Sequence, residues 1–131
     1  MGFPSEKLGA LFLFSLLLIS IVAADFSLSS LNVFINVNLD GSANVEEKLD
    51  LLINGTQSRD LYDTTRAAYS DLATWKDRTQ LSEMRHHITR ANADITNLRI
   101  VPQAVERCNS FLGVCHGVVV LDYVVPAGVN G

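Results

Sequence analysis

Positive charge is scarce in this chain. Its 131 residues include 10 lysines and arginines against 14 aspartates and glutamates, so the formal net charge at pH 7 is −4. Nucleic acids and anionic lipid headgroups bind to basic surfaces, and the composition of this mildly acidic chain indicates no such surface. The composition therefore predicts no nucleic-acid partner and no electrostatic binding to a membrane surface.

Motifs that mark common enzyme classes are missing as well. The sequence has no glycine-rich phosphate loop, no Gly-x-Ser-x-Gly nucleophile elbow and no His-Glu-x-x-His zinc motif. It also has no internal repeat and no low-complexity tract. No catalytic residue and no cofactor is predicted, so a non-enzymatic role is favoured, with an enzyme kept as the alternative.

One long apolar run does occur, near the start of the chain. Residues 8–23 are mostly apolar, follow Lys7 and lead into the small residue Ala24. A signal-peptide core typically has about 7–15 residues and a membrane-spanning helix about 17–25, so this run lies between the two. Residues 1–24 are therefore predicted to be either a cleaved signal peptide or a retained, hydrophobic N-terminal membrane anchor.

Both interpretations of this leader place the rest of the chain on the same side of a membrane. Lys7 favours the cytoplasmic side, so residues 25–131 are predicted to be exported and to lie outside the cytoplasm, extracellular or at the cell surface. If the leader is retained, residues 8–24 contact the membrane. The leader also resembles archaeal pilin signals, although Leu8 separates Lys7 from Gly9. A pilin-like filament subunit is a lesser alternative.

The sequence beyond the leader predicts a β-hairpin. From Val33 to Leu39 every second residue is apolar, the period of a half-buried strand, and Asp40-Gly41 then suits a type I′ turn. The return strand places apolar residues on one side: Val45, Leu49, Leu51 and Ile53. Glu47 is the exception on that side. Such one-sided polarity is typical of an antiparallel sheet with one face in water.

The same hairpin supports a resemblance. A strand, the sequence DGSANVEE and a second strand resemble the opening hairpin of exported β-rich domains in uncharacterised archaeal and bacterial membrane proteins. The resemblance covers residues 31–54 and implies an extracytoplasmic location and a β-containing fold. It implies no activity, because such families have none assigned.

Asn54, Gly55 and Thr56 form an Asn-x-Thr sequence at the end of the second strand. This is the acceptor pattern for N-glycosylation of exported proteins. An Asn-Gly pair is also an ordinary turn at the end of a strand. Asn54 is therefore a glycosylation candidate, and a simple turn is the alternative.

Helical periodicity replaces strand alternation between residues 59 and 91. One helical stripe is formed by Leu61, Thr65, Ala68, Leu72 and Trp75. After a break near the sequence TWKDRT, a second and shorter helix is predicted from Leu81, Met84 and Ile88. A lone tryptophan at a helix end is typically the largest side chain of a small core, so Trp75 is predicted to be buried rather than to stack on a ligand.

Two further strands complete the predicted fold. The segment DITNLRIVP stops at Pro102, and GVVVLDYVVP stops at Pro126 after a run apolar enough to be buried on both faces. The predicted fold class is α+β, a small antiparallel sheet in the order β-β-α-α-β-β with two helices on one side, preceded by the N-terminal hydrophobic helix. Residues 25–131 are predicted to form a single domain.

Cys108 and Cys115 are the only cysteines. An even number of cysteines in an exported chain favours a disulfide, and closing this short ring stabilises the fold by about 2.5 kcal/mol in the chain-entropy model. The alternative is a Cys115 nucleophile beside a His116 base. Adjacent residues of an extended chain point to opposite faces, so the disulfide is predicted.

The histidines offer one further possibility, a metal site. Glu83 and His87 are four residues apart and share a face of the predicted helix, and His116 would be a third ligand. The neighbouring His86 diverges from His87 by about 100° on a helix. The competing interpretation is an exposed Glu83–His87 pair on a helix surface. No metal is predicted, and these three residues are kept only as candidate ligands.

Two classes of function remain. The first is an exported or membrane-tethered domain that acts as a structural or interaction module of the cell envelope, with another envelope protein as partner. The second is a metal-binding protein or hydrolase whose site assembles only in three dimensions. A polar pocket around His87 and His116 would favour the second class, and an apolar or sheet-edge patch the first.

Overall fold

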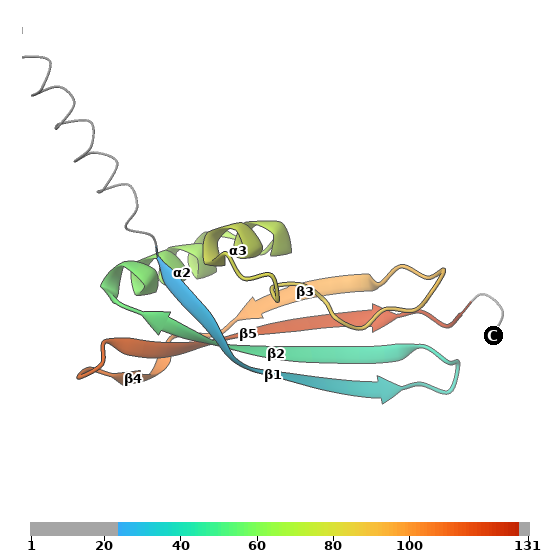
Figure 1. Cartoon of the computed structure of the whole chain (residues 1–131). Coiled ribbons are helices and arrows are strands. Elements are labelled where there is room, and N and C mark those ends of the chain that lie inside the picture. Colours follow the sequence, from blue (N-terminus) through green and yellow to red (C-terminus); the bar gives the residue numbers. More distant parts are fainter. Residues whose placement is uncertain (1–23, 129–131) are drawn as a thin grey trace, which may run out of the picture.

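The structure is a computed structural model that describes residues 24–128 (Figure 1). This part of the chain consists of β1 (Asp25–Val37), β2 (Ala43–Asn54), α2 (Thr56–Ala68), α3 (Leu72–Thr79), β3 (Thr96–Pro102), β4 (Glu106–Asn109) and β5 (Val114–Val125). The five strands form one sheet in the order β1-β2-β5-β3, and β4 also pairs with β5. All pairs are antiparallel, so an α+β fold with a small antiparallel sheet is confirmed.

The order of elements differs from the predicted one because of β4. This four-residue strand lies in the segment expected to be a loop, and it pairs with the start of β5 beside β3. The predicted leader over residues 1–24 lies, apart from Ala24, outside the described residues. Among residues 24–128 no helix is both long and apolar enough to cross a membrane.

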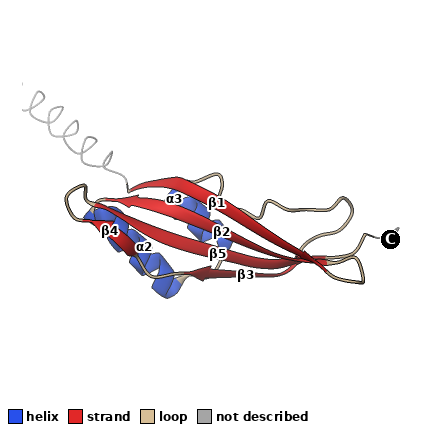
Figure 2. Ribbon diagram, turned by 90° about the horizontal axis from the view of Figure 1, so that it is seen from below, coloured by secondary structure: helices blue, strands red, loops and turns tan. Residues whose placement is uncertain are grey.

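The sheet has one covered face and one open face. The helices α2 and α3 lie on the same side of it, and no helix of the described residues lies on the other side (Figures 1 and 2). Side chains alternate between the two faces along β2, as predicted, because successive residues of a strand point in opposite directions. The covered face of β2 consists of Ala43, Val45, Glu47, Leu49, Leu51 and Ile53, all buried.

The strand β5 forms the centre of the sheet. It pairs with β2 along its whole length, which places Leu49 opposite Val119. Three consecutive residues, Val119 to Leu121, are buried, which confirms that this strand is buried on both faces for part of its length. It ends at Val125, directly before Pro126, as predicted.

Aromatic residues fill the space between helices and sheet. Trp75 has no exposed surface, and its ring meets Tyr62 edge to face at 5.4 Å between centroids. Its indole Nε1 donates a hydrogen bond to the carbonyl oxygen of Tyr69 at 3.1 Å. The predicted core position of Trp75 is confirmed.

The break between the helices lies earlier than predicted. The first helix ends at Ala68, and Asp71 caps the second, accepting a hydrogen bond from the backbone N–H of Thr74 at 2.9 Å. Aspartate is a favoured N-cap because it satisfies an N–H group that lacks a partner within the helix. The sequence TWKDRT therefore lies inside α3 instead of interrupting a helix.

The second helix predicted over residues 81–88 is wrong. The helix α3 ends at Thr79, and its C-cap residue Gln80 has a left-handed φ of 58°. Beyond it, the backbone N–H groups of His87 and Ile88 donate to side chains of the sheet, at 2.8 and 3.0 Å, instead of to helical carbonyls. Met84 is nevertheless fully buried. The apolar spacing thus marked a buried residue but not a helix.

The predicted hairpin between β1 and β2 is confirmed, but its turn is not of type I′. Gly41 is the only residue of the turn with positive φ, 88°, and its N–H donates to the carbonyl oxygen of Asn38 at 3.0 Å. Leu39 and Asp40 occupy the centre of the turn, a pattern typical of three-residue hairpin loops. The backbone N–H of Ser42 donates to the Asp40 carboxylate at 2.9 Å.

Candidate functional site

The outer half of β1 is exposed on both sides. Among residues 24–128, β1 pairs only with β2 and is therefore an edge of the described sheet. Its first half reaches the core through Phe26, whereas all six residues of Asn32–Val37 are exposed. We call Asn32–Val37 the distal segment. Its apolar side chains have large exposed fractions: Val33 37%, Phe34 55%, Ile35 51% and Val37 68%.

This exposure corrects the prediction that β1 is half-buried along the alternating stretch that begins at Val33. Strands rise about 3.3 Å and helices about 1.5 Å per residue. At equal length, 13 residues each, β1 therefore extends about twice as far as α2. The helices cover the end of the sheet where β1 begins and leave its distal segment uncovered (Figure 1).

The distal segment also lacks charge. No charged residue occurs between Asp25 and Asp40. Edge strands are normally protected against adding a foreign strand by charges, prolines or bulges. The register shift of β1 falls between Leu28 and Ser30, before the distal segment. The distal segment has none of these protections.

The opposite edge of the sheet is protected. There, β3 carries Arg99, has a register shift before that residue and ends at Pro102. The short strand β4 continues this edge and carries Glu106 and Arg107. The two edges thus differ in the features that prevent strand addition.

A groove of about 580 Å³ lies on the sheet beside the distal segment. On its β1 side the Phe34 ring is half-exposed, and Lys48 Nζ lies 5.6 Å from its centroid. On its β3 side Arg99 and Asp122 form an ion pair at 3.1 Å. Its polar lining also includes Asn36, Asn44, Glu46 and Asn97. The groove combines aromatic and amide surface with few free charges.

On the covered face, Glu47 is fully buried and accepts three hydrogen bonds. The donors are the backbone N–H of His87 at 2.8 Å, the ring Nδ1 of His87 at 2.5 Å and the hydroxyl of Tyr123 at 2.5 Å. Burial, helped by the hydrogen bond to Glu47, raises the pKa of Tyr123 to about 12, so its hydroxyl remains a donor. The cluster fastens the segment that follows α3 to the sheet.

A carboxylate that orients a histidine ring is also part of many hydrolytic sites. Such a site needs a nucleophile at the other ring nitrogen. The hydrogen bonds of residues 24–128 include none to Nε2 of His87. The Glu47–His87 pair therefore acts as a structural contact in this arrangement.

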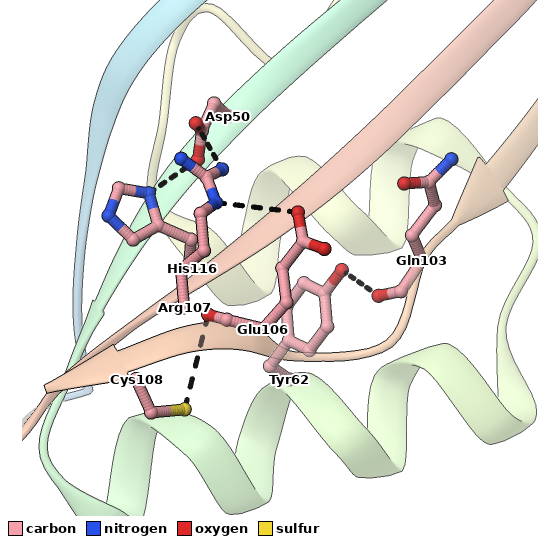
Figure 3. Close-up of polar contacts among 7 residues, drawn as sticks. All are labelled: Asp50, Tyr62, Gln103, Glu106, Arg107, Cys108 and His116. Atoms are coloured by element: carbon pink, nitrogen blue, oxygen red, sulfur yellow. Dashed lines mark hydrogen bonds and ion pairs between the residues drawn. The ribbon is translucent and has the colours of Figure 1, made fainter. Parts of the chain in front are cut away.

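A second charged cluster lies on the open face (Figure 3). Asp50 accepts hydrogen bonds from Arg107 Nη2 at 2.7 Å and from His116 Nδ1 at 2.8 Å. Burial alone would raise the pKa of Asp50, but the hydrogen bonds from Arg107 and His116 outweigh it and hold the pKa below its usual value. The guanidinium already neutralises the carboxylate, so this is an ion-pair network.

The three candidate metal ligands are not brought together. His87 contacts Glu47 on the covered face, whereas His116 contacts Asp50 on the open face. The helix that would have aligned Glu83 with His87 is not formed. Within residues 24–128 no group of three or more His, Cys, Asp or Glu side chains is arranged to hold a metal ion.

The predicted covalent features have different outcomes. Cys108 and Cys115 form the predicted disulfide, which joins β4 to β5 and leaves neither sulfur free as a nucleophile. Asn54 is exposed at the end of β2, and its Nδ2 donates to the carboxylate of Asp25 at 2.9 Å. Glycosylation of Asn54 stays a prediction.

Two features of the site were missed by reasoning from sequence. The position of Glu47 on the apolar side of β2 was a signal, because a buried carboxylate requires donors. Its partners, His87 and Tyr123, lie far away in the sequence. The other missed feature is the exposure of the distal segment, for which the absence of charge between Asp25 and Asp40 was the available signal.

Similarity to known proteins does not assign a function here. Comparison of the chain with protein-family models, with curated proteins and with solved structures found no match. Function is therefore inferred from the geometry described above.

Proposed function

We propose that residues 24–128 form a protein-interaction module that binds an extended polypeptide strand along the distal segment of β1. The observation that carries this proposal is the exposed, uncharged and unpaired edge of Asn32–Val37. Strand addition to a free sheet edge is a recurring mode of peptide recognition, in which backbone hydrogen bonds supply much of the affinity.

The chemistry of the edge defines the partner strand. Val33, Ile35 and Val37 project on the side of the covered face, and Phe34 projects on the open face beside the groove. A charged side chain placed against them would lose water without gaining a partner, which is unfavourable. The partner is therefore an uncharged strand that presents apolar residues on the side of the covered face.

The disulfide supports an extracytoplasmic location for this module. Disulfides such as Cys108–Cys115 persist in oxidising compartments and are rare in the cytosol. An exported domain, tethered by residues 8–24 if the leader is retained, would present β1 to other proteins of the cell envelope. The described module thus fits the structural or interaction role predicted from sequence.

The competing class, a metal-binding protein or hydrolase, has less support. Its expected pocket around His87 and His116 would require the two rings to converge, but each contacts a different carboxylate on a different face of the sheet. An apolar patch at a sheet edge was the feature expected of an interaction module, and the distal segment is such a patch.

Peptide binding tests the proposal. A labelled six-residue peptide of alternating threonine and valine, capped at both ends, is titrated with the purified full-length protein in detergent, and fluorescence anisotropy is measured. We expect saturable binding that is lost in Ile35→Lys, because the new charge lies in the paired strand. A peptide with glutamate in place of threonine should bind more weakly.

Leu98→Lys is the matched control for this titration. Leu98 is 41% exposed and lies on β3, the opposite edge, so a charge added there should leave peptide binding unchanged. The proposal is rejected if the folded wild-type protein shows no saturable binding, or if both lysine variants weaken binding equally.

A further inference from the structure

The geometry points to a second copy of this chain as the strand that pairs with β1. Two copies meet through their distal segments, antiparallel and related by a two-fold axis, so that their sheets join into one. This inference rests on the function proposed above and names its partner.

Two-fold symmetry restricts which residues can meet. The axis is perpendicular to the joined sheet, so a residue at the axis lies opposite its own copy. A charged residue there would face an identical charge, and like charges directly opposite each other destabilise a strand pair. The stretch between Asp25 and Asp40 contains no charge, so it meets this requirement over its whole length.

If Phe34 lies at the axis, each residue of the distal segment pairs with a residue of the same chemical kind in the second copy. Val33 then lies opposite Ile35 of the second copy, and Asn32 lies opposite its Asn36. The register within each copy places Asn32, Phe34 and Asn36 on the open face, opposite Lys48, Glu46 and Asn44 of β2. Cross-strand aromatic pairs and apolar pairs are the favourable contacts of antiparallel sheets.

The pairing would bury surface that each copy leaves exposed. Val33 and Ile35 of both copies would form one apolar row on the side of the covered faces, and the helices of both copies would lie on that same side. The free N–H and C=O groups of the two edges would bond to each other, which satisfies groups that a lone edge leaves to water.

The symmetry also limits the size of the assembly. An isologous interface uses the same patch on both partners and therefore closes after two copies. The opposite edge of the described sheet, with Arg99 and Pro102, is protected against further addition. The expected assembly is a closed dimer and not a filament.

Cysteine cross-linking of the purified full-length protein tests the inference. Phe34→Cys should form a disulfide-linked pair of chains under mild oxidation, because residues opposite each other in a strand pair have Cβ atoms about 4.5–5.5 Å apart. Phe111→Cys is the control, since Phe111 is 95% exposed between β4 and β5, away from the edge. We expect linkage of Phe34→Cys to be at least about tenfold faster, because pairing raises the local concentration of the two thiols.

Sedimentation velocity provides a second readout without new cysteines. Edge-strand interfaces are small and their association is weak, so the wild-type protein is measured at about 0.1–1 mM. We expect a dimer for the wild type and for Leu98→Lys, and a monomer for Ile35→Lys. A monomeric wild type, or cross-linking of Phe34→Cys no faster than that of Phe111→Cys, overturns the second-copy inference.

The peptide titration separates this failure from failure of the proposed function. A wild-type protein that is monomeric but still binds the threonine–valine peptide leaves the interaction module intact and assigns its edge to a different strand. A monomeric protein that binds no peptide rejects both.

Discussion

The carboxylate of Glu47 accepts hydrogen bonds from both the backbone N–H and the ring Nδ1 of His87, forty residues further along the chain. Glu47 lies on the central part of the sheet, and His87 lies in a segment without helix or strand. This contact replaces the regular hydrogen bonds that the segment lacks. It also provides the fully buried carboxyl group of Glu47 with the hydrogen-bond partners that a buried polar group requires.

Removing this carboxylate should strongly destabilise the fold. Glu47→Ala leaves the buried Tyr123 hydroxyl and the partly buried His87 donors without an acceptor, and we expect the free energy of unfolding to fall by about 1–3 kcal/mol for each unsatisfied donor. Glu47→Gln should cost less, because its amide oxygen still accepts. Urea denaturation measures both variants.

The neighbouring residue provides the control for Glu47. Glu46 is half-exposed on the other face, and Glu46→Ala should change the free energy of unfolding by no more than about 0.5 kcal/mol. Similar losses for Glu46→Ala and Glu47→Ala would contradict the assigned role.

Gly117 is required by the packing of Tyr62. A Cβ at residue 117 would lie 2.7 Å from Cζ of Tyr62 and 2.8 Å from Cδ1 of Ile53, closer than atoms can approach. The Tyr62 hydroxyl donates to the carbonyl oxygen of Gln103, which holds the ring in place. We therefore expect Gly117→Ala to lower the free energy of unfolding by about 1–3 kcal/mol, measured by urea denaturation.

A double-mutant cycle identifies the cause of that loss. In a Tyr62→Leu background the obstructing ring is absent, so Gly117→Ala should cost less than it does in the wild type. An equal cost in the two backgrounds would mean that the methyl group is not excluded by Tyr62.

Asp50 should make stability depend on pH in the acidic range. Its pKa is lower in the folded protein than in the unfolded chain, so the ionised form favours folding. This contribution is fully present above the ordinary aspartate pKa of about 3.9 and is lost as pH falls through the lower pKa of the folded state. Asp50→Asn should therefore lose stability at neutral pH and approach the wild type near pH 2.

Chemical denaturation of both proteins across this range measures the difference. The expected result is a gap in the free energy of unfolding that narrows toward low pH. A gap of constant size would show that the ion pairs with Arg107 and His116 contribute nothing through the charge of Asp50.

The disulfide should stabilise the described domain without being part of a reaction. Reduction of the wild type should lower its free energy of unfolding by about 2.5 kcal/mol, because the unfolded chain regains the freedom that the Cys108–Cys115 ring removes. Cys108→Ala is the control, since Cys108 is exposed and this variant has no bond to reduce. A reductant effect of the same size in the variant would point to a cause other than the disulfide.

Short-range patterns in the sequence determined much of this fold. The alternation along residues 43–54 was sufficient to predict β2 and its two faces, because strand side chains alternate whatever surrounds them. Pro102 and Pro126 marked strand ends because proline lacks the N–H that a sheet needs. The pairing of Cys108 with Cys115 followed from their number and short separation.

Only the tertiary structure decided which surfaces are covered. The apolar residues of 81–88 have helical spacing. However, the backbone N–H groups of His87 and Ile88 donate hydrogen bonds to Glu47 and Tyr123 on the sheet, so they are not available to a helix. The distal segment carries the alternation of a half-buried strand, yet the helices are too short to reach it. A local sequence pattern indicates the period of the backbone and which side chains are hydrophobic. Whether a distant element lies there to meet that side chain depends on contacts between residues far apart in sequence.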